Sequence, residues 1–388
     1  MLNDELRAHL TGRILPFWDA LADSEKGGWY GWMDFDLKVN KEAHKGCILN
    51  SRILWSYATA YRLLGDEKDR RMAQRALDFM SRFEDPVNGG VYWSVTADGQ
   101  PLDTTKHTYC QAFAVYGLAA WYRATGDRAA LEKAMRLFHV VEDKCTDEGG
   151  YGEAYKLDFS PESNEKLSEN GVMAGRTMNT LLHVLEGWAE LYRAGHDEEV
   201  RRAGVTCLRR FLEKMYNPEK RRLEVFYDRD YHPLLDMQSY GHDIEGSWLI
   251  WDAVTTLLPE SEWAPYRDMC LTLAGSVYER AWTDHGLKNE IVDGDENQTR
   301  VWWVQAETVL GFANAYQLTG EKRYADAVLH QWQYIQRCIV DPRPGSEWYW
   351  CTGEDGTPIR ERPIVEEWKC PYHNSRMVLR MLETKPGI

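Results

Sequence analysis

The sequence predicts an all-α fold: an (α/α)6 barrel of about twelve helices with short β-hairpins at one mouth. The first observation is a repeat, because segments rich in glycine and aromatic residues recur at residues 27, 89, 149, 222, 285 and 345, at spacings of 62, 60, 73, 63 and 60 residues. The second is that each interval holds helical stretches broken once by a short turn. Since no flexible linker divides the chain, residues 1–388 are expected to form one barrel domain.

Each repeat reads as two helices joined by a tight turn and followed by a hairpin. The turns contain Gly65, Gly126, Gly195 and Gly320, and a less similar fifth break lies near Pro259. At each glycine an apolar helix ends, and an acidic residue then opens the next helix. The segments "GGWYGW", "GGVYW", "GGYGEAY", "RLEVFYD", "HGLKNE" and "GSEWYW" read as the hairpins. An open solenoid would need polar repeats at its ends, and their absence favours a closed ring.

The third repeat is the longest and contains a polar insertion, "KLDFSPESNEKLSENG", at residues 156–171. This segment is either a solvated loop or a lid over the opening of the ring.

Charge and hydropathy exclude several classes of partner. With 61 acidic and 46 basic side chains the net charge is −15, which disfavours binding to nucleic acid and to anionic membranes. No apolar run approaches the roughly 18 residues of a membrane span, and the N-terminus lacks the apolar core of a signal peptide. A soluble, cytoplasmic monomer is therefore expected.

Cysteine and aromatic content point to the kind of site. The eight cysteines show no CxxC pair and are expected to be reduced thiols. The 17 Trp and 21 Tyr exceed the needs of a core. A sugar would suit such a composition, because its C–H faces stack on aromatic rings while its hydroxyl groups bind polar neighbours.

Unusual polar residues occupy the same place in successive repeats, near the start of the helix that follows each hairpin. Two H-x-x-E pairs, His183 with Glu186 and His242 with Glu245, lie 59 residues apart. The comparable positions elsewhere hold Arg52, Tyr109 with Gln111, Glu307 and His373. In a closed ring these six positions would converge on one mouth.

An i, i+3 spacing places His and Glu on one face of a helix, where the carboxylate can orient the imidazole for general acid or base catalysis. The alternative is that each is a hydrogen-bonded core histidine. Trp248, Trp302, Trp303 and Trp368 are core or sugar-binding residues, and either Trp302 or Trp303 must point away from the mouth, because neighbours on a helix diverge by about 100°. Asp243 and the remaining histidines are expected to be structural or exposed.

Metal and cofactor motifs are not evident. Di-metal helical bundles use E-x-x-H, the reverse of the order found here, and the sequence contains neither HExxH nor a phosphate-binding glycine motif. No metal and no cofactor are therefore expected.

From end to end the chain resembles the cellobiose 2-epimerases, a group within the N-acylglucosamine 2-epimerase family. The motifs are "GGWYGWMDFDL", "KGCILNSRILW", "KHTYCQAFAVYGL", "LSENG", "TMNTLLH", "SYGHDIEGSW", "TRVWWVQAE" and "WKCPYHNSRM". The resemblance implies an (α/α)6 barrel, a site without a cofactor, and reversible C2 epimerisation of the reducing-end glucose of β-1,4-linked disaccharides.

The resemblance also implies roles for individual residues. The essential residues of the family match His183, His242, His373 and Arg52. Its substrate-binding residues match Tyr109, Asn179, Glu245, Trp248, Trp303, Glu307 and Trp368.

These residues suggest a two-base mechanism through an enediolate. Inversion at C2 requires acid and base groups on both faces of the planar intermediate, and His242 and His373 are the expected pair. Arg52 and His183 would stabilise the developing oxyanion. Glu245 would orient His242. Trp303 and Trp368 would stack on the sugar rings.

Other readings stay open at this stage. Protonation at C1 instead of C2 would give an aldose–ketose isomerase, and an N-acylglucosamine substrate is a second variant within the family. An inverting glycoside hydrolase would need two carboxylates roughly 6.5–9.5 Å apart. In a non-catalytic sugar-binding barrel the histidines would only hydrogen-bond to hydroxyl groups.

Overall fold

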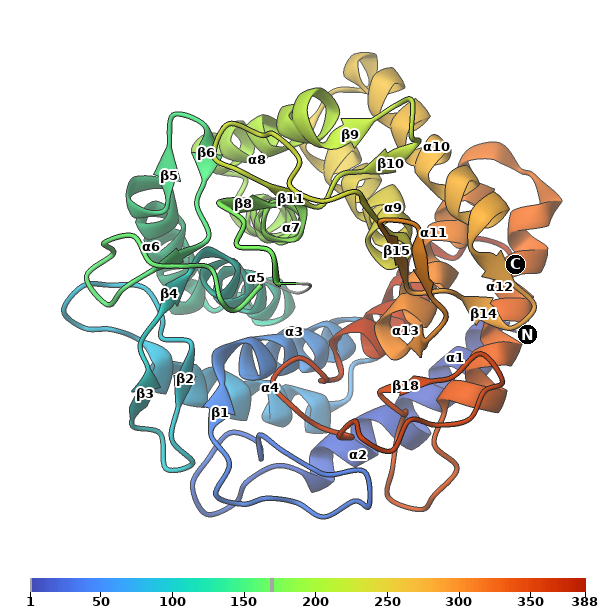
Figure 1. Cartoon of the computed structure of the whole chain (residues 1–388). Helices are drawn as coiled ribbons and strands as arrows, with labels where there is room; N and C mark the ends of the chain where they lie inside the picture. Colours follow the sequence, from blue (N-terminus) through green and yellow to red (C-terminus); the bar gives the residue numbers. More distant parts are fainter. Residues whose placement is uncertain (1, 168–170) are drawn as a thin grey trace.

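The computed structural model describes residues 2–167 and 171–388, and its helices alternate between an inner and an outer ring (Figure 1). The inner helices are α3 (Cys47–Leu64), α5 (Thr108–Thr125), α7 (Met178–Gly195), α9 (Tyr240–Leu257), α11 (Trp302–Thr319) and α13 (Tyr372–Thr384). The outer ring begins with α1 (Leu2–His9), a π-helical turn (Leu10–Ile14) and α2 (Leu15–Ala20), and continues with α4 (Glu67–Met80), α6 (Arg128–Lys144), α8 (Glu198–Arg210), α10 (Ala264–Arg280) and α12 (Lys322–Tyr334). With the first run counted as one helix, the described residues form the predicted twelve.

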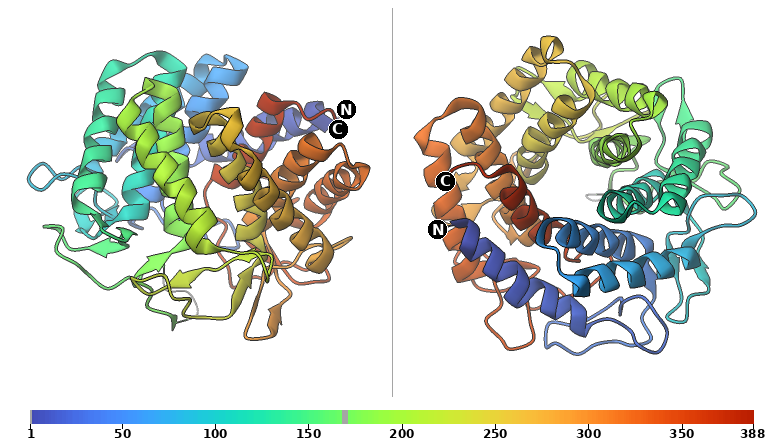
Figure 2. Two further views of the ribbon diagram at one scale, coloured as in Figure 1. Left: turned by 90° about the horizontal axis from the view of Figure 1, so that it is seen from above. Right: turned by 180° about the vertical axis from the view of Figure 1, so that it is seen from behind.

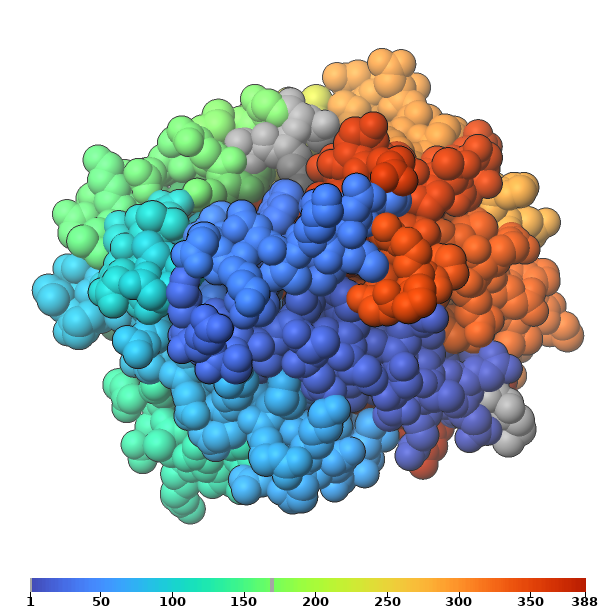
Figure 3. All heavy atoms as spheres, turned by 90° about the horizontal axis from the view of Figure 1, so that it is seen from below, coloured from blue at the N-terminus to red at the C-terminus, as the bar shows by residue number. Residues whose placement is uncertain are grey.

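The inner helices close into a ring. Each contacts the next along the chain, and α13 contacts α3. The outer helix of the first repeat packs on α13, so the two ends of the chain complete one helix pair together. Figure 1 places the termini side by side, and Figure 3 shows the N-terminal segment in dark blue packed against orange and orange-red segments from the last part of the chain. The closed barrel is thus confirmed, and the open solenoid is wrong.

The strands gather at one end of the barrel (Figure 2, left). One set forms the predicted hairpins, which are β5 (Thr146–Asp147) with β6 (Gly150–Tyr151), β9 (Tyr216–Asn217) with β10 (Arg222–Leu223), and β13 (Trp282–Thr283) with β14 (Gly286–Leu287). In the other three repeats the hairpin is reduced to single bridges, Ala22 to Trp29, Glu84 to Val91 and Val340 to Trp348.

A second set of strands joins each repeat to the next. The pairs are β1 (Lys45–Gly46) with β2 (Ser94–Val95), β4 (Lys106–His107) with β7 (Ala154–Tyr155), β8 (Arg176–Thr177) with β11 (Phe226–Tyr227), β12 (Met237–Ser239) with β15 (Glu290–Val292), and β17 (Arg300–Val301) with β18 (Cys351–Thr352). β3 (Pro101–Asp103) and β16 (Asp295–Asn297) extend two of them. A bridge from Met33 to Val365 closes this circle. The first strand of each pair leads directly into an inner helix, so the pairing fixes where that helix starts.

Each hairpin turn is fixed by a short polar side chain that accepts a hydrogen bond from a backbone N–H two or three residues later. The residues are Asp23, Asp85, Asp147, Asn217, Thr283 and Asp341. In the first three repeats a basic residue two positions before the inner helix pairs with this aspartate; Lys45, for example, lies 2.7 Å from Asp23. These bonds connect the turn to the start of the inner helix.

The fourth residue of three inner helices reaches back to the hairpin. Gln111 accepts from Val91 N at 2.7 Å and donates to Val91 O at 2.8 Å. Gln305 binds both backbone groups of Leu287 in the same way, and Asp243 accepts from Leu223 N at 2.8 Å. Asp243 is therefore structural, as predicted, whereas the placement of Gln111 at the mouth was wrong.

The predicted helix breaks hold, with one difference. Left-handed residues end the inner helices at Gly65, Gly126 and Gly320. In the third repeat, however, Gly195 is still helical and His196 takes the left-handed position at φ 52°. The left-handed position is therefore one residue later than the glycine that the sequence suggested. Histidine tolerates this conformation better than most residues that carry a Cβ.

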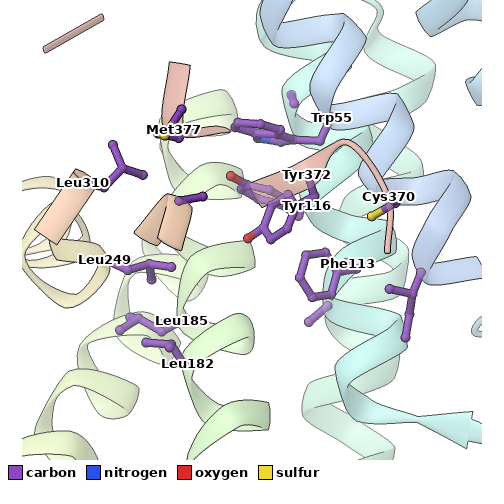
Figure 4. Close-up of a cluster of buried hydrophobic side chains, with 14 of the residues drawn as sticks. Trp55, Phe113, Tyr116, Leu182, Leu185, Leu249, Leu310, Cys370, Tyr372 and Met377 are labelled. Carbon is purple, nitrogen blue, oxygen red and sulfur yellow. The ribbon is translucent and has the colours of Figure 1, made fainter. Parts of the chain in front are cut away.

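Glycine also brings neighbouring inner helices close together. A Cβ on Gly117 would lie 2.7 Å from the carbonyl oxygen of Ser51 on α3, and one on Gly311 would lie 2.8 Å from that of Ile244 on α9. Below the mouth the ring interior is filled by apolar side chains from all six inner helices, including Trp55, Tyr116, Leu185, Leu249, Leu310 and Met377 (Figure 4). Among the described residues, no helix combines the length and apolar character that crossing a membrane requires.

The paired bonds of Gln305 can be tested by unfolding. Gln305→Met keeps the side-chain length but leaves the N–H and C=O of Leu287 buried without these partners, at a cost of about 1–3 kcal/mol for each group. Urea denaturation should show the loss as a lower midpoint. Gln317→Met, an exposed position on the same helix, should leave the midpoint unchanged. Equal midpoints for the two variants would contradict this role for Gln305.

Candidate active site

A cavity of about 730 Å³ opens at the hairpin end of the barrel. Nine of the eleven predicted site residues line it, namely Arg52, Tyr109, Asn179, His183, His242, Glu245, Trp303, Trp368 and His373. They come from all six inner helices or from the turn before α13, because each inner helix presents its first two turns to this end. Glu307 and Trp248 are buried behind the lining instead.

His183 has the partner that the sequence predicted. Its Nδ1 lies 2.9 Å from Oε2 of Glu186, one turn later on α7. The His183 ring packs edge-on against Tyr109, with ring centroids 5.0 Å apart. The carboxylate thus engages Nδ1 of His183 and leaves Nε2 without this partner.

His242 has a different partner from the one predicted. Its Nδ1 lies 2.8 Å from Oγ of Ser239, the residue that caps α9, and not next to Glu245. Glu245 instead accepts from Arg376 on α13. The H-x-x-E spacing was the same as in α7, but a buried cation on another helix attracts this carboxylate, and sequence spacing carries no sign of that cation.

His373 is held by an acid from a neighbouring helix. Its Nδ1 lies 2.8 Å from Oε1 of Glu307 on α11. The ring of Trp303 lies between the two histidines, with its centroid 4.8 Å from His242 and 5.5 Å from His373. Both imidazoles thus pack against the same indole ring.

Arg52 places a buried positive charge on the cavity wall. It is 2 % exposed, and its Nη2 donates to the hydroxyl of Tyr109 at 2.6 Å. Its guanidinium stacks 4.2 Å from the Phe113 ring and 4.6 Å from the Tyr372 ring. Within the described residues, no carboxylate lies at salt-bridge distance from it. A buried cation without a counterion attracts negative charge on a ligand.

Three polar atoms on lining residues have no hydrogen-bond partner within the described chain although they are buried. They are Nε of Arg52, Oδ1 of Asn179 and Nε1 of Trp302. Buried polar groups are normally satisfied, so these two donors and one acceptor are available to a polar ligand such as a sugar hydroxyl.

Both tandem tryptophans line the cavity, so the prediction that one of them points away was wrong. Trp302 opens α11, and its ring packs across the rim against Trp350 at 5.0 Å. Trp302 is the first residue of α11, so its side chain lies at the hairpin end of the barrel although it points in a different direction from Trp303.

Arg376 was missed by the sequence reasoning. It is fully buried and donates to Glu186 at 2.6 Å and to Glu307 at 2.8 Å, as well as to Glu245 and the hydroxyl of Tyr372. Trp248 packs on its guanidinium at 4.8 Å and donates to the second oxygen of Glu307 at 2.9 Å. The sequence feature that could have revealed Arg376 is its i, i+3 spacing from His373, which places both side chains on one face of the helix.

The local environment keeps both histidines of the pair neutral near pH 7. Burial lowers the pKa of His242 to about 3. Burial and the nearby Arg376 charge hold the pKa of His373 well below its usual range. Although burial opposes ionisation, Arg376 and His183 lower the pKa of Glu186 to about 2. His242, next to Ser239, and His373, next to Glu307, thus each offer a nitrogen lone pair that can accept a proton.

One cluster of acids and a histidine has the spacing of a metal site, but Arg376 already binds its two acids. Donor atoms of Glu245, Glu307 and His373 lie within 4.8 Å of one another, as a metal site requires. Arg376, however, donates to both carboxylates. The guanidinium supplies the positive charge that a metal would bring, so the donor set does not fit a metal.

The polar insertion reaches the cavity. Lys166 and Leu167 line it, and Asn164 accepts a hydrogen bond at 3.3 Å from Leu167 N. Lys166 and Leu167 form part of the cavity wall, and whether the insertion is a lid or a solvated loop stays a prediction. The part of the insertion at residues 168–170, within "LSENG", lies outside the described residues.

Comparison with known proteins places this site in a family. The family model for N-acylglucosamine 2-epimerase (GlcNAc 2-epimerase) matches residues 28–374. The chain belongs to the N-acylglucosamine 2-epimerase family.

Within the N-acylglucosamine 2-epimerase family, similar members share both sequence and fold with the chain. A cellobiose 2-epimerase of Eubacterium cellulosolvens is 45% identical over 401 residues, covering 99% of each chain. The structure of a cellobiose 2-epimerase from Bacillus thermoamylovorans B4167 superimposes with a TM-score of 0.96 at 40% identity, covering 99% of each chain. A sugar epimerase from a ruminal bacterium gives a TM-score of 0.98 at 41% identity, with the same coverage.

The protonation state of His242 can be measured directly. In an NMR titration of ring signals, His242 should stay neutral from pH 8 down to pH 5, because its pKa is lowered to about 3. Exposed His232, whose pKa is raised by its hydrogen bond to Asp228, should titrate above pH 6.5. His242→Gln and His232→Gln assign the two signals. A His242 midpoint near 6.5 would contradict the buried, neutral state.

Proposed function

We propose that this protein is a carbohydrate epimerase that inverts C2 of the reducing-end glucose of β-1,4-linked disaccharides such as cellobiose and lactose. The observation that carries the proposal is the pair of histidines, His242 on α9 and His373 on α13, whose rings both pack against Trp303. The relatives that bear the name cellobiose 2-epimerase support the substrate class.

The chemistry begins with opening of the pyranose ring, which exposes the C1 aldehyde. One histidine then removes the proton from C2 with its free Nε2. The planar enediolate receives a proton on its other face from the second histidine, which carries this proton on Nε2 before the step and is neutral after it. Because Nδ1 of each histidine is engaged by Ser239 or Glu307, Nε2 is the nitrogen left for this transfer. Two groups are necessary, since one base on one face would return the starting sugar.

Removal of the C2 proton requires stabilisation of the negative charge that develops on oxygen. Arg52 supplies a buried cation without a carboxylate partner in the described chain, and His183 stands beside Tyr109 on the same wall. Preorganised donors of this kind contribute several kcal/mol in a site that excludes water. Trp303 and Trp368 offer ring faces to the sugar.

The size of the cavity supports a disaccharide. About 730 Å³ is the space of about 24 water molecules at roughly 30 Å³ each, which is room for two sugar rings. Hydrolysis is less well supported. The acids Glu245 and Glu307 both accept from Arg376, so neither is a free general acid.

The two-base scheme predicts that His242→Ala and His373→Ala each abolish epimerisation of cellobiose while the protein stays folded. His330→Ala, an exposed histidine on α12, should retain wild-type turnover. In deuterated water the wild-type enzyme should place deuterium at C2 of both epimers, as measured by NMR.

Other products would identify other chemistry. Near wild-type turnover in either single variant would eliminate the two-base scheme. A ketose product would indicate an aldose–ketose isomerase, and free glucose would indicate a hydrolase. Absence of deuterium exchange at C2 would indicate a sugar-binding protein without catalytic activity.

A further inference from the structure

The carboxylates that orient two of the cavity histidines share one cation. Glu186 holds His183, Glu307 holds His373, and Arg376 donates to both acids through separate nitrogens. The result is a continuous hydrogen-bonded chain from one histidine through Arg376 to the other, crossing α7, α13 and α11. Every side chain in it is less than 10 % exposed.

The direction of each bond in this chain follows from the chemistry of its ends. Both acids accept from Arg376, and its positive charge favours the carboxylate form of each: it lowers the pKa of Glu186 and counteracts the burial that raises the pKa of Glu307. An ionised carboxylate can only accept, so Nδ1 of His183 and of His373 must carry a proton. Neutral imidazole has one such proton, and the Nε2 lone pair is then free.

We propose that Arg376 is a positioning residue, which fixes His183 and His373 as Nδ1–H tautomers by keeping Glu186 and Glu307 as acceptors in fixed orientations. The proposal rests on the proposed function for its effect on catalysis, but not for its effect on the tautomers. Arg376 itself lies behind the cavity and does not line it.

His242 provides an internal contrast. Its Nδ1 partner is the hydroxyl of Ser239, which can donate or accept, and within the described residues no acid bound to Arg376 forms a hydrogen bond with this histidine. Loss of Arg376 should therefore alter His183 and His373 but not His242. A general loosening of the barrel would affect all three.

Charged and titratable groups from all six inner helices belong to this hydrogen-bonded chain or lie next to it. They are Arg52 on α3, Tyr109 and Tyr116 on α5, His183 and Glu186 on α7, His242 and Glu245 on α9, Glu307 on α11, and Tyr372 and His373 on α13. Arg376 is the cation that bonds to the three acids among them.

The matched pair of variants is Arg376→Lys and Arg380→Lys. Lysine keeps the charge but loses the planar fork that reaches several acids at once. Arg380 lies one turn further along α13 and pairs with Asp252 and Glu383, away from the histidines. It belongs to a chain of ion pairs across the far end of the barrel, formed by Arg62, Glu383, Arg380, Asp252, Arg193, Glu190 and Arg123.

With cellobiose as substrate, Arg376→Lys should lower kcat roughly 10- to 100-fold, the usual effect of removing a group that orients a catalytic histidine. KM should change less than kcat, because Arg376 does not line the cavity and reaches it only through the side chains that it holds. Arg380→Lys should keep kcat within about threefold of wild type. Thermal unfolding, measured by circular dichroism, shows whether both variants keep the wild-type fold.

The tautomers are read without substrate, from long-range ¹H–¹⁵N spectra of protein labelled in the histidine rings. In the wild-type protein His183 and His373 should be Nδ1–H tautomers, and in Arg376→Lys their signals should shift while that of His242 stays. His183→Gln and His373→Gln assign the signals.

Nε2–H tautomers in the wild-type protein would overturn the proposal whether or not any variant folds. So would an Arg376→Lys protein with kcat within threefold of wild type, or equal losses of kcat in the two lysine variants. If the wild-type protein does not epimerise cellobiose, the proposed function fails, while the spectra still decide the role of Arg376.

Discussion

One buried guanidinium organises the centre of this barrel. Arg376 is fully buried and donates to acids on three neighbouring helices, so α7, α9 and α11 are tied to α13 at one level. Burying a charge is costly unless it is paired and hydrogen-bonded, and three buried carboxylates would repel one another without a cation. The cluster is therefore interdependent, and the orientation of two histidines depends on it.

The barrel brings these groups to one level through repetition. Five of the six inner helices have 18 residues, and each follows a short strand that is paired with the next repeat. Polar turn residues, together with Gln111, Asp243 and Gln305 at the fourth position of three inner helices, connect the hairpins to the helix starts. Because the starts coincide, side chains from the first two turns of each helix converge on one opening, while the far end is filled by apolar residues and ion pairs.

Much of this could be predicted from residues close together in the sequence. The turn spacing predicted the number of helices and the closed ring, and the i, i+3 spacing predicted the pairing of His183 with Glu186. The identical spacing failed for His242 and Glu245, because Arg376 lies 131 residues from Glu245 and attracts its carboxylate. The hydroxyl of Ser239, the residue before α9, bonds to His242 instead. Trp248 and Glu307, predicted as substrate-binding residues, lie behind the cavity lining, where Glu307 bonds to His373 and Trp248 bonds to Glu307.

The sequence by itself determined the repeat, the helices with their breaks, and the set of polar residues that meet at one mouth, because all of these follow from local patterning and short-range spacing. The tertiary structure decided which acid orients which histidine, that Arg52 has no carboxylate partner in the described chain, and that Arg376 stands at the centre. Those properties depend on distances between helices, on burial and on competition among charges, and none of these is encoded in the spacing of residues along one helix.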